Sequence, residues 1–350
     1  MSEFLTEYGM FLAQVVTLVL AALFIMAGIA NVSRQRQFQD EEQGHIRVRH
    51  LNRELDEMRD GVQQAVLPAA QRKQARKQRK REEKARHKAE KQAPVSQQQR
   101  PRVFVLDFEG DLRASAVSGL RREINAVLRV AGRDDEVVVR LESPGGLVHG
   151  YGLAASQLRR IRDNGNRLTV CVDKVAASGG YMMACIAERI HSAPFAVVGS
   201  IGVVAQIPNF HRLLKRNDID VELITAGEHK RTLTLFGENT EKGRQKFQEE
   251  IEDTHSLFKD FVRENRRNLE MEKVATGEHW FGTRARELGL VDEIMTSDEY
   301  LLARCEEADV YEVSWRIKQR LAERLGFSAE GVLERVLERW FYRGVGRFWQ

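Results

Sequence analysis

Cysteine is scarce in this chain, whose 350 residues contain only Cys171, Cys185 and Cys305. Three thiols cannot form a closed set of disulfides, and two of them lie in apolar runs, where a free cysteine behaves as a small hydrophobic residue. CxxC pairs, the HExxH motif and Cys/His clusters with zinc spacing are also missing. The cysteines therefore leave the redox compartment open, and we assign no structural or catalytic metal.

Charge is missing from residues 8–32, which read YGMFLAQVVTLVLAALFIMAGIANV. About 25 such residues are enough to cross a hydrocarbon core of about 30 Å as a helix. A signal peptide has a basic start and a shorter apolar region, whereas Glu3 and Glu7 precede this long span. We predict an uncleaved transmembrane anchor over residues 1–33, with a buried soluble helix as the alternative.

Aromatic residues are nearly missing from residues 34–100, which are rich in Arg, Lys, Gln and Glu. This composition cannot bury a core and predicts a charged, basic tether that is helical or disordered. Binding of single-stranded nucleic acid would call for aromatic residues on which bases stack, so we expect no nucleic-acid partner. Attraction to anionic lipid headgroups beside the anchor explains the basic charge more economically.

From residue 102 onward, apolar strands alternate with amphipathic helices. The pattern predicts strands at 102–108, 136–141 and 167–173, and helices at 115–130 and 150–164. This order indicates an α/β domain with a mostly parallel sheet that is covered on both faces. Such folds place their ligands at the carboxyl ends of the strands, so the loops there deserve the closest reading.

The loop after the second strand reads ESPGGLVHG and holds Gly145 and Gly146 directly before a helix. Free backbone N–H groups at a helix N-terminus can hold an anion or a developing oxyanion. A tight turn that requires a positive φ explains the same glycines without any ligand.

The loop after the third strand reads KVAASGGYMMACIA and places Ser178 at a strand-to-helix turn. This is the position of a nucleophile elbow, although the Gly-x-Ser-x-Gly pattern of hydrolases is not met. A serine nucleophile needs a base. The histidines of the region have no companion acid at a telling position: His149, His191, His211, His229, His255 and His279.

A buried lysine is the other candidate base, because desolvation lowers the pKa of an amine. Lys230, in TAGEHKRTLT, follows a predicted strand at 220–225 across a glycine turn. Lys174 lies only four residues before Ser178, but it precedes the turn. These residues alone do not decide between a catalytic lysine and a surface lysine.

Five motifs occur in a fixed order: ESPGG, DKVAASGGYMMA, GSIGVV, GEHKR and FGTRARELGLVDEI. Together with the anchor and the tether, they give the chain a resemblance to the signal peptide peptidase A family of serine peptidases over essentially its whole length. The resemblance implies a crotonase-like, ClpP-related fold, with repeated β-β-α units and a parallel sheet. It also implies a Ser-Lys dyad in place of a Ser-His-Asp triad.

Carried over residue by residue, the resemblance makes Ser178 the nucleophile and Lys230 the general base. Ser200, in GSIGVV, matches the hydroxyl that orients the lysine amine. The backbone N–H groups of Gly179 and Gly146 would form the oxyanion hole, with Gly145 less suited than Gly146. No metal or organic cofactor is implied.

The resemblance implies a membrane-anchored serine endopeptidase of the bacterial inner membrane. Its expected partners are polypeptides, namely signal-peptide remnants and misfolded or membrane-associated chains, and other copies of itself in a ring-like homo-oligomer. The expected domains are the anchor (1–33), the tether (34–100), the protease domain (101–312) and an amphipathic helical tail (313–350).

Two questions stay open at this point. The resemblance places the protease domain in the periplasm, whereas the arginines after the anchor favour the cytoplasm. An acyl-CoA enzyme could use the same glycine-turn oxyanion hole, and a membrane-anchored scaffold or binder could retain the fold with little activity.

Overall fold

The computed structural model describes residues 44–68, 70–74, 77–78, 81, 84–85, 100–227 and 229–317. The chain divides into one unit over Val48–Ser314 and a second that comprises Met1–Arg47 and Trp315–Gln350. The predicted anchor and most of the predicted tail lie outside the described residues. None of the helices within those ranges is long and apolar enough to cross a membrane.

Within the described residues, a seven-stranded sheet has the order β1-β10-β2-β3-β4-β6-β9. The pairs from β10 to β9 are all parallel. The strands are β1 (Gly44–His50), β2 (Arg102–Glu109), β3 (Glu136–Glu142), β4 (Arg167–Val172), β6 (Arg189–Ser192), β9 (Glu293–Ile294) and β10 (Asp309–Ile317). The mixed α/β architecture with a largely parallel sheet is therefore confirmed.

A smaller sheet in the described part of the chain has the order β5-β7-β8, with β5 (Val175–Ala177), β7 (Val197–Gly199) and β8 (His279–Phe281). Strand β5 pairs parallel with β7, and β7 pairs antiparallel with β8. Because β5 follows β4 after only two residues, the chain leaves the large sheet and enters the small one just before Ser178.

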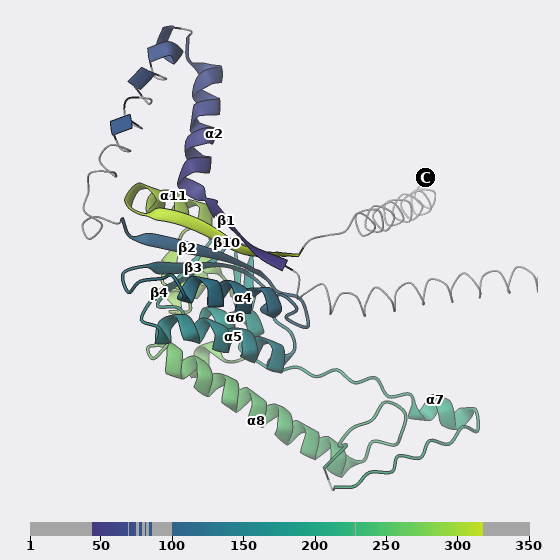
Figure 1. The fold of residues 1–350 in the computed structure, drawn as a ribbon. Coiled ribbons are helices and arrows are strands. Elements are labelled where there is room, and N and C mark those ends of the chain that lie inside the picture. Colours follow the sequence, from purple (N-terminus) through teal and green to yellow (C-terminus); the bar gives the residue numbers. More distant parts are fainter. Residues whose placement is uncertain are drawn as a thin grey trace, which may run out of the picture. The chain divides into compact units, whose positions relative to one another are not determined.

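The helices cover both faces of the large sheet. Figure 1 shows α11 on one face, and α4, α5 and α6 on the other. The helices are α2 (Leu51–Val66), α4 (Val117–Leu128), α5 (Val148–Asp163), α6 (Gly179–Ala184), α7 (His211–Arg216), α8 (Glu241–Asn265), α9 (Met271–Val274), α10 (Gly282–Glu287) and α11 (Ser297–Glu307).

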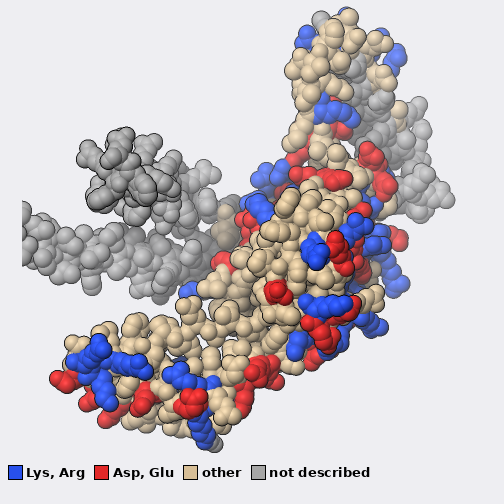
Figure 2. All heavy atoms as spheres, turned by 180° about the vertical axis from the view of Figure 1, so that it is seen from behind, with Lys and Arg blue, Asp and Glu red and all other residues tan. Residues whose placement is uncertain are grey.

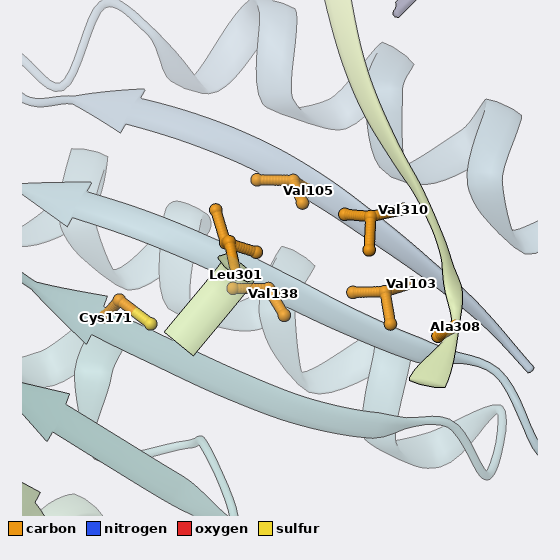
Figure 3. Packing of buried hydrophobic residues seen from close by; sticks show 7 residues of the cluster. All are labelled: Val103, Val105, Val138, Cys171, Leu301, Ala308 and Val310. Carbon is orange, nitrogen blue, oxygen red and sulfur yellow. The ribbon is translucent and has the colours of Figure 1, made fainter. Parts of the chain in front are cut away.

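Alternate residues of the strands fill the two faces, because successive side chains of a strand point to opposite sides. On one face, Leu301 of α11 packs against strands β2, β3, β4 and β10. Figure 3 shows this cluster: Val103, Val105, Val138, Cys171, Leu301, Ala308 and Val310. On the other face, Phe108 of β2 packs edge-to-face with Tyr151 of α5. Both faces of the parallel sheet are therefore dry, as such sheets require.

The three strands and two helices predicted after residue 102 are confirmed as β2, β3, β4, α4 and α5, with no more than two residues of difference at either end. The predicted strand at 220–225 is wrong, because those residues are exposed and belong to no strand. Their alternation of apolar and polar residues resembles a strand, but a strand also needs a neighbour for its backbone hydrogen bonds.

Two elements extend the folded region beyond the expected limits. Strand β1 and helix α2 lie in the segment that was predicted to be a tether, and Asn52 explains how α2 is attached. Its side-chain amide donates to the carbonyl oxygens of Cys305 (2.8 Å) and Ala308 (2.9 Å) and accepts from the Val310 N–H (2.8 Å). Strand β10 also continues to Ile317, so the residues just after 312 form a strand and not a helical tail.

Candidate active site

Ser178 lies on the sharp turn between β5 and α6. Its backbone has φ 52° and ψ −117°, a conformation that residues other than glycine rarely adopt and that costs about 1–3 kcal/mol. The turn is held from both sides, because the Ser178 N–H donates to Gly199 (2.8 Å) and the Ser178 carbonyl accepts from Met182 (2.9 Å). A strained serine at a strand-to-helix turn is the backbone geometry expected for a nucleophile.

The glycine turn after β3 lies directly against Ser178. Ser143 connects the two, because its N–H donates to Val175 (2.8 Å) and its carbonyl accepts from Ala177 (3.0 Å). Gly145 has φ 89°, and a methyl group on it would lie 2.7 Å from the Ser178 Cβ and 2.8 Å from the Gly179 nitrogen. The approach is so close that only glycine fits at this position.

Two backbone N–H groups beside Ser178 are free to donate. The Gly145 N–H is used, since it donates to the Ser143 hydroxyl (3.1 Å). The N–H groups of Gly146 and Gly179 donate to no other residue in the described part of the chain. Gly179 is the first residue of α6, where the N–H groups have no partner within the helix. Free N–H groups in such a position can stabilise an oxyanion.

Ser200 occupies the turn next to Ser178. Strands β5 and β7 pair in the register Ala177 with Gly199, so the two serines each follow the last paired residue of adjacent strands. Ser200 also has a positive φ, 51°, and its N–H donates to the Glu278 carbonyl (2.7 Å). The structure therefore brings Ser178, Ser200 and the two glycine N–H donors together.

The structure does not bring Lys230 into this group. Its side chain is exposed, and it forms no hydrogen bond or ion pair with another described residue. Only its backbone is held, by a bond from its N–H to Gly227 (3.2 Å). Lys174 is not a substitute, because its ammonium lies 2.8 Å from Glu142 and that carboxylate raises the pKa of the lysine.

The histidines give no alternative base within the described residues. His191 of β6 is buried on the face of the large sheet that α11 covers, where its ring lies against that of Tyr300 (centroids 4.6 Å apart). Burial lowers the pKa of His191. His255 comes nearer, since its Nε2 lies 3.1 Å from the carbonyl oxygen of Ile201, next to Ser200.

Sequence analysis missed two side chains that support the glycine turn. The Tyr151 hydroxyl lies 2.6 Å from the Ser143 hydroxyl and donates to the Asp111 carbonyl (2.8 Å). Ser143 is part of the ESPGG motif, but the motif predicts a role only for the glycines. Nothing in the sequence distinguishes Tyr151 from any other apolar position of an amphipathic helix.

Comparison with known proteins assigns the chain to a family. Residues 3–158 match "Peptidase family S49 N-terminal" and residues 160–311 match "Peptidase family S49". A "Probable protease SohB" of Haemophilus influenzae is 50% identical over 345 residues, which are 97% of each chain. Another, of Buchnera aphidicola from Schlechtendalia chinensis, is 46% identical and covers 86% of this chain and 100% of that one.

The chain belongs to peptidase family S49, and its similarity to the proteases named SohB extends over most of its length. We therefore treat it as a peptidase that acts on polypeptides. A solved structure of a membrane-bound stomatin-specific protease is 12% identical and covers 59% of this chain and 86% of that one. Its TM-score of 0.41 is too low to position individual residues.

Proposed function

We propose that the protein is a serine endopeptidase in which Ser178 is the nucleophile. The observation that carries the proposal is the strained Ser178 turn with the unused N–H groups of Gly146 and Gly179 beside it. The Ser178 Oγ would attack the scissile carbonyl, and the two N–H groups would stabilise the oxyanion of the tetrahedral intermediate. Collapse of this intermediate breaks the C–N bond and gives an acyl-enzyme, while the leaving amine takes the proton that the general base accepted from Ser178. Water then hydrolyses the acyl-enzyme and restores the Ser178 hydroxyl.

Lys230 would act as the general base, and Ser200 would orient its amine. The Lys230 side chain is exposed and lies apart from Ser178, so the proposal requires it to leave water and approach Ser178. Residues 202–240, which carry Lys230, have few buried side chains. In Figure 2 this projecting segment has uncharged areas between clusters of charge, and its exposed apolar side chains include Val204, Leu213, Ile224 and Phe236.

A second copy of the chain is the partner that we propose for this segment. Apolar side chains as exposed as Val204 (91%) and Ile224 (90%) are more stable when covered. In a ring-like homo-oligomer, the segment of one copy would reach its neighbour and bring Lys230 to Ser178. Mixing Ser178→Ala protein with Lys230→Ala protein tests this, because activity would return only if the two residues come from different copies. No recovery would instead favour a segment that folds back on its own chain.

Extended polypeptides with small or hydrophobic side chains at the cleaved position are the proposed substrates. Support comes from Leu112, Leu147 and Val148, which are exposed next to Gly146. Signal-peptide remnants and misfolded or membrane-associated chains have this chemistry. Mapping of cleavage sites in casein would refute the preference if charged side chains dominated at that position.

The membrane anchor and the finer fold class complete the proposal. Residues 1–33 would hold the enzyme in the bacterial inner membrane, residues 34–43 and 67–100 would tether it, and the domain would have the crotonase-like, ClpP-related arrangement. The side of the membrane follows from a C-terminal fusion to a reporter that is active in only one compartment. A reporter active only in the periplasm would agree with the family resemblance, and the opposite result with the charges after the anchor.

The central experiment measures cleavage of casein and of a fluorogenic hydrophobic peptide by the full-length protein in detergent. Ser178→Ala and Lys230→Ala should both abolish cleavage, and Lys230→Arg should do so as well because a guanidinium does not act as a base. Lys174→Ala is the matched control and should retain activity. If Ser178→Ala cleaves as well as wild type, the site is not catalytic and a binding role on the same fold becomes the better reading.

A further inference from the structure

A series of hydrogen bonds runs from the glycine turn, through the buried hydroxyls of Ser143 and Tyr151, to the loop at Asp111. The Gly145 N–H donates to the Ser143 hydroxyl (3.1 Å), which lies 2.6 Å from the Tyr151 hydroxyl. The Tyr151 hydroxyl in turn lies 2.8 Å from the carbonyl oxygen of Asp111. Ser143 and Tyr151 are both fully buried, so water does not compete for the bond between their hydroxyls or for the bond from the Gly145 N–H.

The direction of this chain follows from counting protons. The Asp111 carbonyl can only accept, so the Tyr151 hydroxyl uses its single O–H to donate a hydrogen bond to it. Ser143 must then donate to the Tyr151 oxygen, which leaves a Ser143 lone pair for the Gly145 N–H. Every group has one role, and none can reverse without breaking a bond. These hydrogen bonds therefore fix the Pro144–Gly145 peptide, which directly precedes the peptide that carries the Gly146 N–H.

The ring of Tyr151 supports the second donor. A methyl group on Gly179 would overlap the ring and lie 2.7 Å from its Cδ2 atom. Because Tyr151 packs against Phe108 and is fully buried, its ring cannot yield. One side chain thus contacts both halves of the proposed oxyanion hole, the hydroxyl through Ser143 and the ring through Gly179.

The far end of the chain is anchored as well. The Asp111 carboxylate accepts from the N–H groups of Arg113 (3.1 Å) and Ser115 (2.8 Å), and the bonds from Ser115 lower its pKa most. In the same loop, the Leu112 carbonyl accepts from the Leu147 N–H (2.8 Å). The loop at Asp111 therefore accepts hydrogen bonds both from the Tyr151 hydroxyl and from the residue after Gly146.

We propose that Tyr151 is a positioning residue that holds both N–H donors of the oxyanion hole through its hydroxyl and its ring. The inference rests on the proposed function, because it assumes that Ser178 is the nucleophile. Tyr151 does not touch the substrate. Its hydroxyl acts on the transition state, in which negative charge reaches the oxygen, and hardly on the bound substrate.

The test compares Tyr151→Phe and Ser143→Ala with a matched control, Tyr181→Phe. Tyr181 is also fully buried, and its hydroxyl also donates to a backbone carbonyl, that of Leu290 (2.9 Å). All three variants lose one buried hydroxyl, but only the first two break the chain to Gly145. Each is measured at full length for thermal unfolding, kcat and KM on the fluorogenic peptide, and inhibition by an N-acetyl peptide boronic acid, whose tetrahedral serine adduct imitates the oxyanion.

In Tyr151→Phe and Ser143→Ala, kcat should fall about 10-fold to 100-fold while KM changes less than about twofold, since losing an oxyanion donor outright costs about 100-fold to 1,000-fold. Boronic acid affinity should fall in parallel, whereas affinity for the matching unreactive peptide amide should not. The double variant should lose about as much as either single variant, because both hydroxyls belong to one chain. Tyr181→Phe should keep the wild-type kcat at a similar loss of stability.

Two results would overturn the inference, and they are distinguishable. If wild type cleaves in a Ser178-dependent manner but Tyr151→Phe and Ser143→Ala match Tyr181→Phe in kcat and boronic acid affinity, only the positioning role is wrong. If wild type shows no Ser178-dependent cleavage, the proposed function fails and the inference fails with it. Should one variant not fold, the other still reports on the same chain.

Discussion

Gly145 offers a sharp test of how closely the glycine turn and the Ser178 turn fit together. The substitution Gly145→Ala adds one methyl group at a backbone φ of 89°, between the Ser178 Cβ (2.7 Å) and the Ala177 carbonyl oxygen (2.8 Å). These neighbours belong to the backbone of a strained turn or sit directly on it, so they cannot rotate away. We expect the variant to be destabilised and to lose activity.

The expected loss of stability has two parts. A non-glycine residue with positive φ costs about 1–2 kcal/mol. Forcing a methyl group into a fully packed site costs about 1–3 kcal/mol more. Alanine also restricts the unfolded chain relative to glycine, which returns about 0.4–1 kcal/mol. Gly145→Ala should therefore reduce the free energy of unfolding by about 1–5 kcal/mol.

Gly165→Ala is the control that separates these parts. Gly165 has nearly the same φ, 86°, but no atom lies within 4 Å of a methyl group placed there. The φ cost and the unfolded-chain term are common to both variants, so their difference isolates the clash at Ser178. Urea unfolding of the full-length proteins, followed by tryptophan fluorescence, gives both free energies of unfolding.

We expect Gly145→Ala to be less stable than Gly165→Ala by about 1–3 kcal/mol, and only Gly145→Ala to lose peptide cleavage. Equal stability of the two variants would mean that the glycine turn can move away from Ser178. The close fit between the two turns, and the preorganisation drawn from it, would then be refuted.

Three further predictions concern other parts of the molecule. Ser178→Gly should abolish cleavage, yet its free energy of unfolding should exceed that of Ser178→Ala by about 1 kcal/mol, because glycine adopts the φ of 52° without strain. Equal urea midpoints of the two variants would argue against a strained turn. Burial lowers the pKa of His191 in the folded state below its ordinary value of 6.5, so the unfolded chain binds the proton more tightly and the free energy of unfolding should fall as the pH drops below about 6.5. In urea titrations at pH 5 to 8, His191→Asn should reduce the slope of the free energy of unfolding against pH. An unchanged slope would contradict the assignment. Arg266 makes a bidentate ion pair with Asp292 (2.9 and 3.0 Å) and its side chain is only 13% exposed, so Arg266→Lys should reduce the free energy of unfolding by about 1–3 kcal/mol. The control Arg284→Lys, in an exposed pair, should reduce it by less than about 1 kcal/mol. Equal losses would show that burial does not strengthen the first pair.

The sequence predicted the elements that are determined locally or by simple burial. Apolar runs bounded by turn residues gave β2, β3 and β4, since both faces of a parallel sheet exclude water. The Ser178 turn was predictable because small residues there leave room for a close approach of two loops. Cys171 and Cys185 are buried as expected, and burial raises the pKa of both thiols.

The errors have a common physical cause, which is dependence on a distant partner. Residues 220–225 have the alternation of a strand but no neighbouring strand in the described residues, so the pattern alone was misleading. Strand β1 and the attachment of helix α2 to the domain were not predicted, for the opposite reason. Their charged composition predicts no core, yet Asn52 fixes the start of α2 to backbone groups more than 250 positions away.

The candidate site is divided between two very different environments. Ser178 and the glycine turn beside it lie in loops between buried elements, and hydrogen bonds from Ser178 and Ser143 to neighbouring strands hold these loops in place. Lys230 lies on an exposed segment with few buried contacts, and segments of that kind open and move at low cost. With Lys230 as the base, the preorganised half would be permanent and the proton-accepting half would form only when something covers the exposed segment. A peptidase built in this way would keep its nucleophile inactive until the exposed segment is covered.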